Sequence, residues 1–98
     1  MNKLNKAQTQ KQLKLLSGWK VKNGKKLTKQ FIFKNFVINM SFLNKVAKVA
    51  EQLGHHPDFK VKYNQVEFEI WTHSAGGITN KDFELALKIE KTIKTLFS

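Results

Sequence analysis

The sequence of 98 residues contains no cysteine and no arginine, and it has only one proline and five glycines. The absence of cysteine excludes disulfides, thiolate nucleophiles, iron–sulfur clusters and cysteine-ligated zinc. The scarcity of proline and glycine excludes fibrous and low-complexity chains. No apolar run is long enough to span a bilayer, and the N-terminal residues lack the apolar region of a signal peptide. We therefore expect a cytoplasmic protein without a membrane partner.

Acidic residues are absent from the first half of the chain. Residues 1–50 contain twelve lysines and no acid, whereas residues 51–98 contain six lysines and seven acids, and the net charge is +11. A strongly basic half favours nucleic acid or another anionic partner. Arginine, however, is the residue that reads guanine edges and binds phosphate through two parallel hydrogen bonds. Because arginine is missing, we interpret the lysines as a solvated surface and expect no specific nucleic-acid partner.

The residues that are present suit one domain over residues 1–98. Hydrophobic residues make up 41% of the chain and include eight phenylalanines, which is enough for a core. Hydrophobic periodicity and turn residues predict the order α-β-β-α-β-β-α. This order favours an α+β domain in which two hairpins form a four-stranded antiparallel sheet and the three helices cover one of its faces.

Capping residues set the expected bounds of the helices. The first helix is expected over residues 5–16. The second runs from an N-cap at Asn35 to a stop at Gly54, and the third begins at Thr79. Asp82 stands three residues after Thr79, so we interpret it as part of a capping box rather than as a catalytic acid.

The first hairpin is expected to turn at Asn23-Gly24, the strongest short turn signal in the sequence. A three-residue loop over 23–25 places Val21 opposite Leu27. A two-residue loop would place Val21 opposite a lysine, and we therefore predict the longer loop. Phe31 and Phe33 then continue the same buried face.

The second hairpin alternates apolar and charged residues on both sides of an expected turn at Asn64-Gln65. This register groups apolar residues on one face of the hairpin and opposite charges on the other. The charged pairs that it predicts are Lys62 with Glu67 and Lys60 with Glu69. Continued beyond the strands, the same register places His56 opposite His73.

All three histidines of the chain, His55, His56 and His73, therefore converge in the prediction. Imidazole exchanges protons near neutral pH, so such a cluster suits acid–base chemistry. Glu51, four residues before His55, is expected to orient that imidazole if the helix continues through Gly54. Zinc bound by three imidazoles is the alternative. Adjacent histidines usually point apart, and no H-x-x-x-H spacing is present, so we favour acid–base use without a metal.

Two further aromatic residues are candidates for the same site. Trp19 and Trp71 have the ordinary interpretation of packing residues. Either could also form a wall against a flat ring, and Trp71 lies next to Thr72 and His73.

A larger set of residues resembles the signature of the pterin-4a-carbinolamine dehydratases. The family pattern has a charged residue, three further residues, His-His-Pro, an aromatic residue, a second histidine position and a final aspartate. This sequence matches it with Glu51, His55-His56-Pro57, Tyr63, Thr72-His73 and Asp82. The likeness extends over residues 5–97. It departs at Gly54, where many members have aspartate, and at Phe59, where tryptophan is common.

The resemblance implies the fold predicted above and the dehydration of 4a-hydroxytetrahydropterin to quinonoid dihydropterin. That reaction recycles the pterin after aromatic amino acid hydroxylation, with the pterin as substrate and no cofactor. It also implies an active site of His55, His56 and His73 and a homodimer or homotetramer. The residues implied to contact the pterin are Pro57, Thr72, Ser74 and Ala75, and Glu51 and Trp19 are further candidates.

Two other functions stay open at this stage. One animal member of the family is a dimerisation cofactor for a homeodomain transcription factor, and the long second helix with its broad apolar face suits a scaffold for a transcription regulator or a hydroxylase. Other relatives are linked to molybdopterin. Nucleic-acid binding is a third and weaker alternative.

Overall fold

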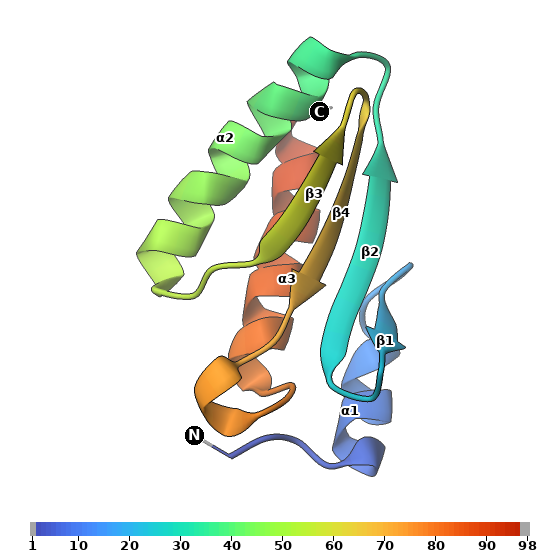
Figure 1. Ribbon diagram of the computed structural model, residues 1–98, viewed down its shortest axis with the longest axis vertical. Helices are drawn as coiled ribbons and strands as arrows, with labels where there is room; N and C mark the ends of the chain where they lie inside the picture. The colour runs from blue at the N-terminus through green and yellow to red at the C-terminus, as the bar shows by residue number, and fades with distance from the viewer. Residues whose placement is uncertain (1, 97–98) are drawn as a thin grey trace.

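A computed structural model describes residues 2–96 of the chain. The helices and strands follow the predicted order, with one additional 3-10 turn. The four strands form one antiparallel sheet in the order β1-β2-β4-β3, and the helices lie on one face of it (Figure 1). The elements are α1 (Lys6–Leu13), β1 (Lys20–Lys22), β2 (Lys26–Ile32), α2 (Phe36–Leu53), β3 (Asp58–Lys62), β4 (Gln65–Ile70), η1 (His73–Ala75) and α3 (Asn80–Leu96).

The second helix begins and ends at the predicted residues. The side chain of Asn35 accepts a hydrogen bond from the backbone N–H of Ile38 at 2.9 Å, as an N-cap does. Gly54 closes the helix in the left-handed conformation, with φ of +66°. This early stop matters for the site, because it ends the helical path before the two adjacent histidines.

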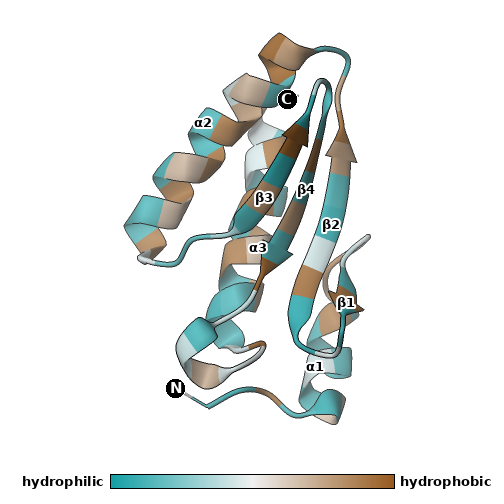
Figure 2. Ribbon diagram, in the orientation of Figure 1, coloured by the Kyte–Doolittle hydropathy of each residue, from teal (hydrophilic) through white to brown (hydrophobic). Residues whose placement is uncertain are grey.

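The core lies between the helices and one face of the sheet. The first hairpin has the predicted register, with Val21 opposite Leu27. Alternation along the strands is visible as teal and brown bands in Figure 2. The ring of Phe42 from α2 packs among strand aromatics, 5.2 Å from the ring of Phe31 and 6.0 Å from that of Phe68. The fully buried strand residues are Leu27, Val66, Phe68 and Ile70.

The second hairpin has a register two residues away from the predicted one. Lys62 pairs with Gln65, so the turn is Tyr63-Asn64 rather than Asn64-Gln65. Tyr63 takes φ of +52°, which a tyrosine rarely adopts. A shift of two residues keeps every side chain on its predicted face, but it changes every cross-strand partner.

Contacts from outside the hairpin explain this register. The buried side chain of Asn39 in α2 donates hydrogen bonds to the carbonyls of Tyr63 and Gln65, both at 3.0 Å. Asn64 accepts a backbone hydrogen bond from Phe33 at 2.7 Å and donates one from its side chain to the Phe33 carbonyl at 2.8 Å. The turn is therefore held by α2 and by the end of β2, which no local pattern in the hairpin predicts.

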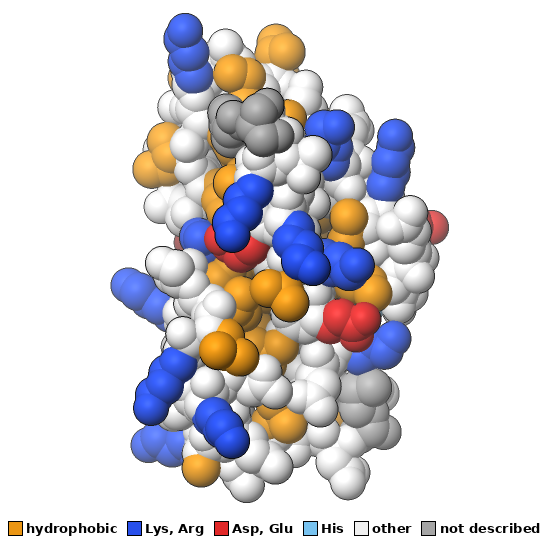
Figure 3. Space-filling model, turned by 180° about the vertical axis from the view of Figure 1, so that it is seen from behind, with side chains coloured by type: hydrophobic (Ala, Val, Ile, Leu, Met, Phe, Trp, Pro, Cys, Tyr) orange, Lys and Arg blue, Asp and Glu red, His pale blue; other side chains and the backbone are white. Residues whose placement is uncertain are grey.

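The predicted ion pairs of the second hairpin are wrong for the same reason. Lys60 faces Glu67, and Glu69 instead contacts Lys22 at 2.5 Å and Lys26 at 3.3 Å. The hydrogen bond from Lys22 lowers the pKa of the Glu69 carboxyl, and the same contact raises the pKa of Lys22. On the face seen from behind, lysines are spread from top to bottom rather than gathered into one stripe (Figure 3).

None of the helices within residues 2–96 combines the length and the apolar character needed to cross a membrane.

Candidate active site

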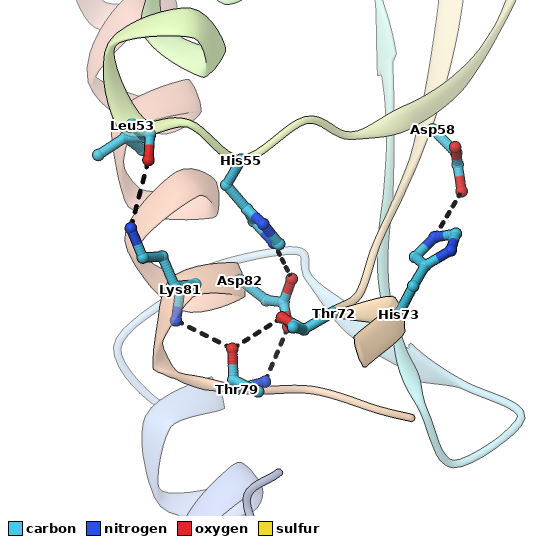
Figure 4. Close-up of polar contacts among 8 residues, drawn as sticks. All are labelled: Leu53, His55, Asp58, Thr72, His73, Thr79, Lys81 and Asp82. Carbon is cyan, nitrogen blue, oxygen red and sulfur yellow. Dashed lines mark hydrogen bonds and ion pairs between the residues drawn. The ribbon is translucent and has the colours of Figure 1, made fainter. Parts of the chain in front are cut away.

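Three segments that are distant in the sequence meet at one end of the molecule. His55 lies in the connection between α2 and β3, His73 begins η1, and Asp82 lies in the first turn of α3. Figure 4 shows His55 directed from its connection toward α3, and His73 directed from η1 toward Asp58 at the start of β3. The left-handed Gly54 ends α2 and Pro57 follows three residues later, so His55 and His56 lie in the connection to β3 rather than on a helix.

The most buried histidine contact joins His55 to Asp82. The Nε2 atom of His55 lies 2.5 Å from Oδ1 of Asp82. The Asp82 side chain is fully buried, and that of His55 is 15% exposed. A buried carboxylate needs hydrogen-bond donors to offset its lost hydration, and an imidazole N–H is one such donor.

The other oxygen of Asp82 belongs to the start of α3. Oδ2 accepts hydrogen bonds from the backbone N–H of Thr79 at 2.7 Å and from the hydroxyl of Thr72 at 2.9 Å. The Thr72 hydroxyl also lies 2.8 Å from that of Thr79. The cap predicted for Asp82 is therefore confirmed. Its contact with His55 was missed, because the two residues are 27 positions apart and no local spacing indicates the contact.

The predicted contact between Glu51 and His55 is not formed. Gly54 adopts the left-handed conformation, and the residues after it leave the helical path. Oε2 of Glu51 instead makes a short contact with Nε2 of His56. Both side chains are exposed to solvent, His56 by 61% and Glu51 by 75%. Glu51 therefore contacts a histidine, but the histidine is His56 and not His55.

His73 is the third imidazole and is also exposed. It stacks on Trp71, with ring centroids 4.0 Å apart and an angle of 29° between the rings. Its Nε2 lies 3.9 Å from Oδ2 of Asp58, and the two side chains are 69% and 64% exposed. The corrected register of the second hairpin, if continued, places His56 opposite Trp71 rather than opposite His73. The structure therefore brings His73 to this end through Thr72 and Asp82, not through strand pairing.

An apolar groove lies beside His56. Its volume is about 360 Å³. Pro57 and Glu51, both predicted to contact a ligand, lie in its wall together with Phe59 of β3. The remaining wall residues come from α2 and are Leu43, Val46, Ala47 and Ala50.

The other predicted ligand-contacting residues take different positions. Ser74 and Ala75 lie in η1 directly after His73. The hydroxyl of Thr72 is engaged with Thr79 and Asp82. The ring of Trp71 is covered by His73 and has the ammonium groups of two lysines within 5.5 Å of its centroid. Its Nε1 is buried without a hydrogen-bond partner in the part of the chain that the structure describes.

Trp19 is not brought to the histidines. It is 5% exposed in the core, where its Nε1 donates to Oε2 of Glu90 at 3.0 Å. Glu90 is eight residues after Asp82 on α3, which corresponds to about 12 Å along a helix. The structure therefore assigns Trp19 to packing, the ordinary interpretation of such a residue.

Residues 2–96 contain no group of three or more histidine or acidic side chains that is arranged to hold a metal ion. The site offers one partly buried imidazole bound to a buried carboxylate and two exposed imidazoles, each beside an exposed carboxylate. Such groups can accept protons from a ligand and deliver protons to it.

Comparison with known proteins places the chain in a family. The family model for pterin 4 alpha carbinolamine dehydratase matches residues 2–92. The chain belongs to this family. A relative from Sulfolobus acidocaldarius, described as "Putative pterin-4-alpha-carbinolamine dehydratase", is 46% identical over 89 residues, which cover 91% of this chain and 97% of the relative. A relative from Nostoc punctiforme with the same description is 44% identical over 88 residues, covering 90% of this chain and 94% of the relative.

Solved structures of dehydratase-like proteins share the fold. The crystal structure of a "transcriptional coactivator/pterin dehydratase" from Brucella melitensis superposes with a TM-score of 0.89 at 34% identity, over 93% of this chain and 98% of that one. A pterin dehydratase-like protein described as a RuBisCO assembly factor in the alpha-carboxysome superposes with a TM-score of 0.65 at 19% identity, over 76% and 88% of the two chains. The second likeness concerns the fold alone.

Proposed function

We propose that this dehydratase-family protein converts a 4a-hydroxytetrahydropterin into the quinonoid dihydropterin and water. In that reaction the bond from C4a to the hydroxyl oxygen breaks, and the leaving hydroxyl takes up a proton and departs as water. N5 loses its proton as the double bond between C4a and N5 forms. The reaction is balanced by two proton transfers, and positioned imidazoles typically accelerate such a transfer by about 10²- to 10⁴-fold.

The observation that carries the proposal is the arrangement of three imidazoles at one end of a family member. We assign the acid and base roles to His55 and His73, and we assign to His56 the positioning of the pterin. Trp71 is suited to form a flat wall beside His73, because the two rings already lie nearly parallel. The residues proposed to contact the pterin are Glu51, Pro57, Thr72, Ser74 and Ala75.

The direct test is a stopped-flow assay with chemically generated 4a-hydroxytetrahydropterin. The wild-type protein should increase the rate well above that of the spontaneous reaction. The variants His55→Ala and His73→Ala should each lose about 10²-fold or more of this increase. A wild-type rate equal to the spontaneous rate would falsify the activity. Full activity in both variants would reject the role assignment and leave the activity standing.

We also propose that the protein associates with further copies of itself, as a homodimer or homotetramer. Strand β3 is at the edge of the sheet, and all five of its residues are exposed, including Phe59 and Val61. An unpaired edge with exposed apolar side chains is a template for pairing with a second strand. The apolar groove between α2 and β3 continues this surface.

Light scattering after size-exclusion chromatography tests the association. The wild-type protein should elute as a dimer or tetramer, and Val61→Lys should shift it toward the monomer while the fold is retained. A wild-type protein that is monomeric at all concentrations would overturn the proposal.

A role in transcription is the second candidate function. The Brucella melitensis structure is described as a transcriptional coactivator as well as a pterin dehydratase. Negligible turnover together with saturable binding to a purified transcription regulator would favour this role, whereas turnover without such binding would favour the enzyme. The supply of pterin by an aromatic amino acid hydroxylase, a molybdopterin-linked role and the cytoplasmic location stay predictions.

A further inference from the structure

One nitrogen of His55 is already occupied in the folded protein. Its Nε2 lies against Oδ1 of Asp82, and Nδ1 has no hydrogen-bond partner within residues 2–96. An imidazole exchanges a proton with a ligand only through a nitrogen that is not engaged elsewhere. Only Nδ1 is therefore available to a substrate.

The hydrogen-bond partners of Asp82 require its side chain to act as an acceptor. Oδ2 receives a backbone N–H from Thr79 and a hydroxyl from Thr72, and both are donors. Asp82 also lies in the first turn of α3, where the helix dipole favours negative charge. A fully buried carboxylate with these partners has its lone pairs directed at donors, which leaves Nε2–H of His55 as the matching donor for Oδ1.

We propose that Asp82 is a positioning residue that fixes the proton of His55 on Nε2, so that His55 exchanges protons with the pterin through Nδ1. This inference rests on the proposed dehydration. Asp82 does not touch the substrate in this scheme. It orients the ring, selects its tautomer and stabilises the imidazolium whenever Nδ1 carries a second proton, as a buried aspartate does in other histidine-dependent sites.

The capping contacts make one variant unusually informative. In Asp82→Asn the side chain has one oxygen and one NH2 group in place of two oxygens. Thr79 and Thr72 both donate hydrogen bonds to the Oδ2 side of the side chain, so the amide oxygen of the asparagine must lie there. In the reverse orientation the NH2 group would face two buried donors that it cannot accept from. With the oxygen on that side, the NH2 group faces Nε2 of His55 and donates to it. The tautomer of His55 reverses, and its proton moves to Nδ1.

Imidazole nitrogen NMR tests the tautomer without any substrate. The chain has three histidines, so the spectrum is simple, and the His55→Gln variant assigns the His55 signals. In the wild type we expect the proton of neutral His55 on Nε2, and in Asp82→Asn we expect it on Nδ1. A wild-type proton on Nδ1, or an unchanged tautomer in a folded Asp82→Asn variant, would overturn the proposal. The wild-type measurement decides the question even if the variant fails to fold.

Kinetics with 4a-hydroxytetrahydropterin tests the consequence for catalysis. Asp82→Asn should lower kcat by about 10²- to 10⁴-fold while KM changes only a few-fold, because the ring remains in place but carries its proton on the wrong nitrogen. Glu84→Gln makes the same chemical change at an exposed position of α3 and should leave tautomer, kcat and KM unchanged. A reversed tautomer with a wild-type kcat would overturn the catalytic part of the proposal.

The two measurements separate this inference from the proposed function. If the wild-type protein does not accelerate the dehydration, the proposed function and the kinetic part fail together. The spectra still decide whether Asp82 fixes the tautomer of His55.

Discussion

The buried and the exposed histidine–carboxylate contacts of this protein have the same chemistry and different surroundings. The pair of His55 and Asp82 is 15% and 0% exposed, whereas the pair of His56 and Glu51 is 61% and 75% exposed. Exposed ion pairs contribute little, because water and salt screen them and because two side chains lose freedom. A buried pair is held in one geometry by packing and by further hydrogen bonds, and removing one partner is costly.

This difference indicates separate roles for His55 and for the two exposed histidines. Asp82 has three donors around its two oxygens, and one of them is the backbone N–H of Thr79, directly before α3. Its imidazole partner is therefore held in one orientation before a substrate arrives. His56 and His73 have one exposed carboxylate each, which a ligand can displace at small cost. One preorganised imidazole beside two adaptable ones suits a site that must both bind a flat ring and transfer protons.

The largest effect should come from removing the buried carboxylate. Asp82→Ala leaves the donors of His55, Thr72 and Thr79 without an acceptor, and we expect a loss of about 3–5 kcal/mol in the free energy of unfolding. This corresponds to a fall in Tm of roughly 10 °C or more for a chain of this size. The matched change at the exposed pair, Glu51→Ala, should stay within about 0.5 kcal/mol. Equal losses in the free energy of unfolding of the two variants, measured in urea, would show that the buried carboxylate stabilises the fold no more than the exposed one.

A smaller effect should come from the hydroxyl that supports the buried pair. Thr72→Val keeps the shape of the side chain and removes the donor to Oδ2 of Asp82. We expect a loss of about 1–2 kcal/mol in urea unfolding, since the N–H of Thr79 still serves that oxygen. Thr72→Ser should recover most of the stability. An unchanged free energy of unfolding in Thr72→Val would mean that the hydrogen bond from Thr72 to Asp82 does not stabilise the fold.

The smallest effect concerns a partly exposed pair outside the site, in which the side chains of Lys22 and Glu69 are 44% and 18% exposed. The hydrogen bond from Lys22 lowers the pKa of Glu69, so this contact stabilises the fold above the ordinary pKa of glutamate. The contribution disappears as the pH falls through the lowered pKa of the folded state. The wild-type protein should therefore lose slightly more Tm than Glu69→Gln on acidification. An equal loss of Tm in the two proteins over an acid pH series would contradict this, whereas a large difference would show that a partly exposed pair can contribute as much as a buried one.

The ends of α2 could be predicted because they depend on neighbouring residues, whereas α1 ends at Leu13 and not at residue 16 as expected. Asn35 caps α2 by accepting a hydrogen bond from the backbone N–H of Ile38, only three residues later. Gly54 ends the helix because glycine adopts positive φ without steric cost. The register of the first hairpin was also correct, since Asn23 and Gly24 are within the loop that determines it.

The second hairpin could not be predicted to the same extent. Its alternation placed each side chain on the correct face, but a shift of two residues satisfies the same alternation. The choice between the two registers comes from Asn39, which bonds the carbonyls of Tyr63 and Gln65 from α2. Since the charged pairs were inferred from the register, the expected partners of Glu69 were wrong as well.

In the candidate site, too, the residues could be found from the sequence but their contacts could not. The three histidines and the cap at Asp82 were evident from spacing, because residue type and local order suffice to recognise them. Their pairing was not evident. Glu51 contacts His56 rather than His55, and Trp19 lies in the core beside Glu90.

The sequence by itself determined the order of elements, the ends of the second helix, the buried faces and the family, because each depends on the identity and spacing of near neighbours. The tertiary structure alone decided which carboxylate serves which imidazole. The packing of α3 against the end of α2 brings Asp82 to His55 across 27 positions of chain, and their burial follows from that packing. Burial and partner choice are properties of the assembled fold, and they distinguish the partly buried His55 from the two exposed histidines.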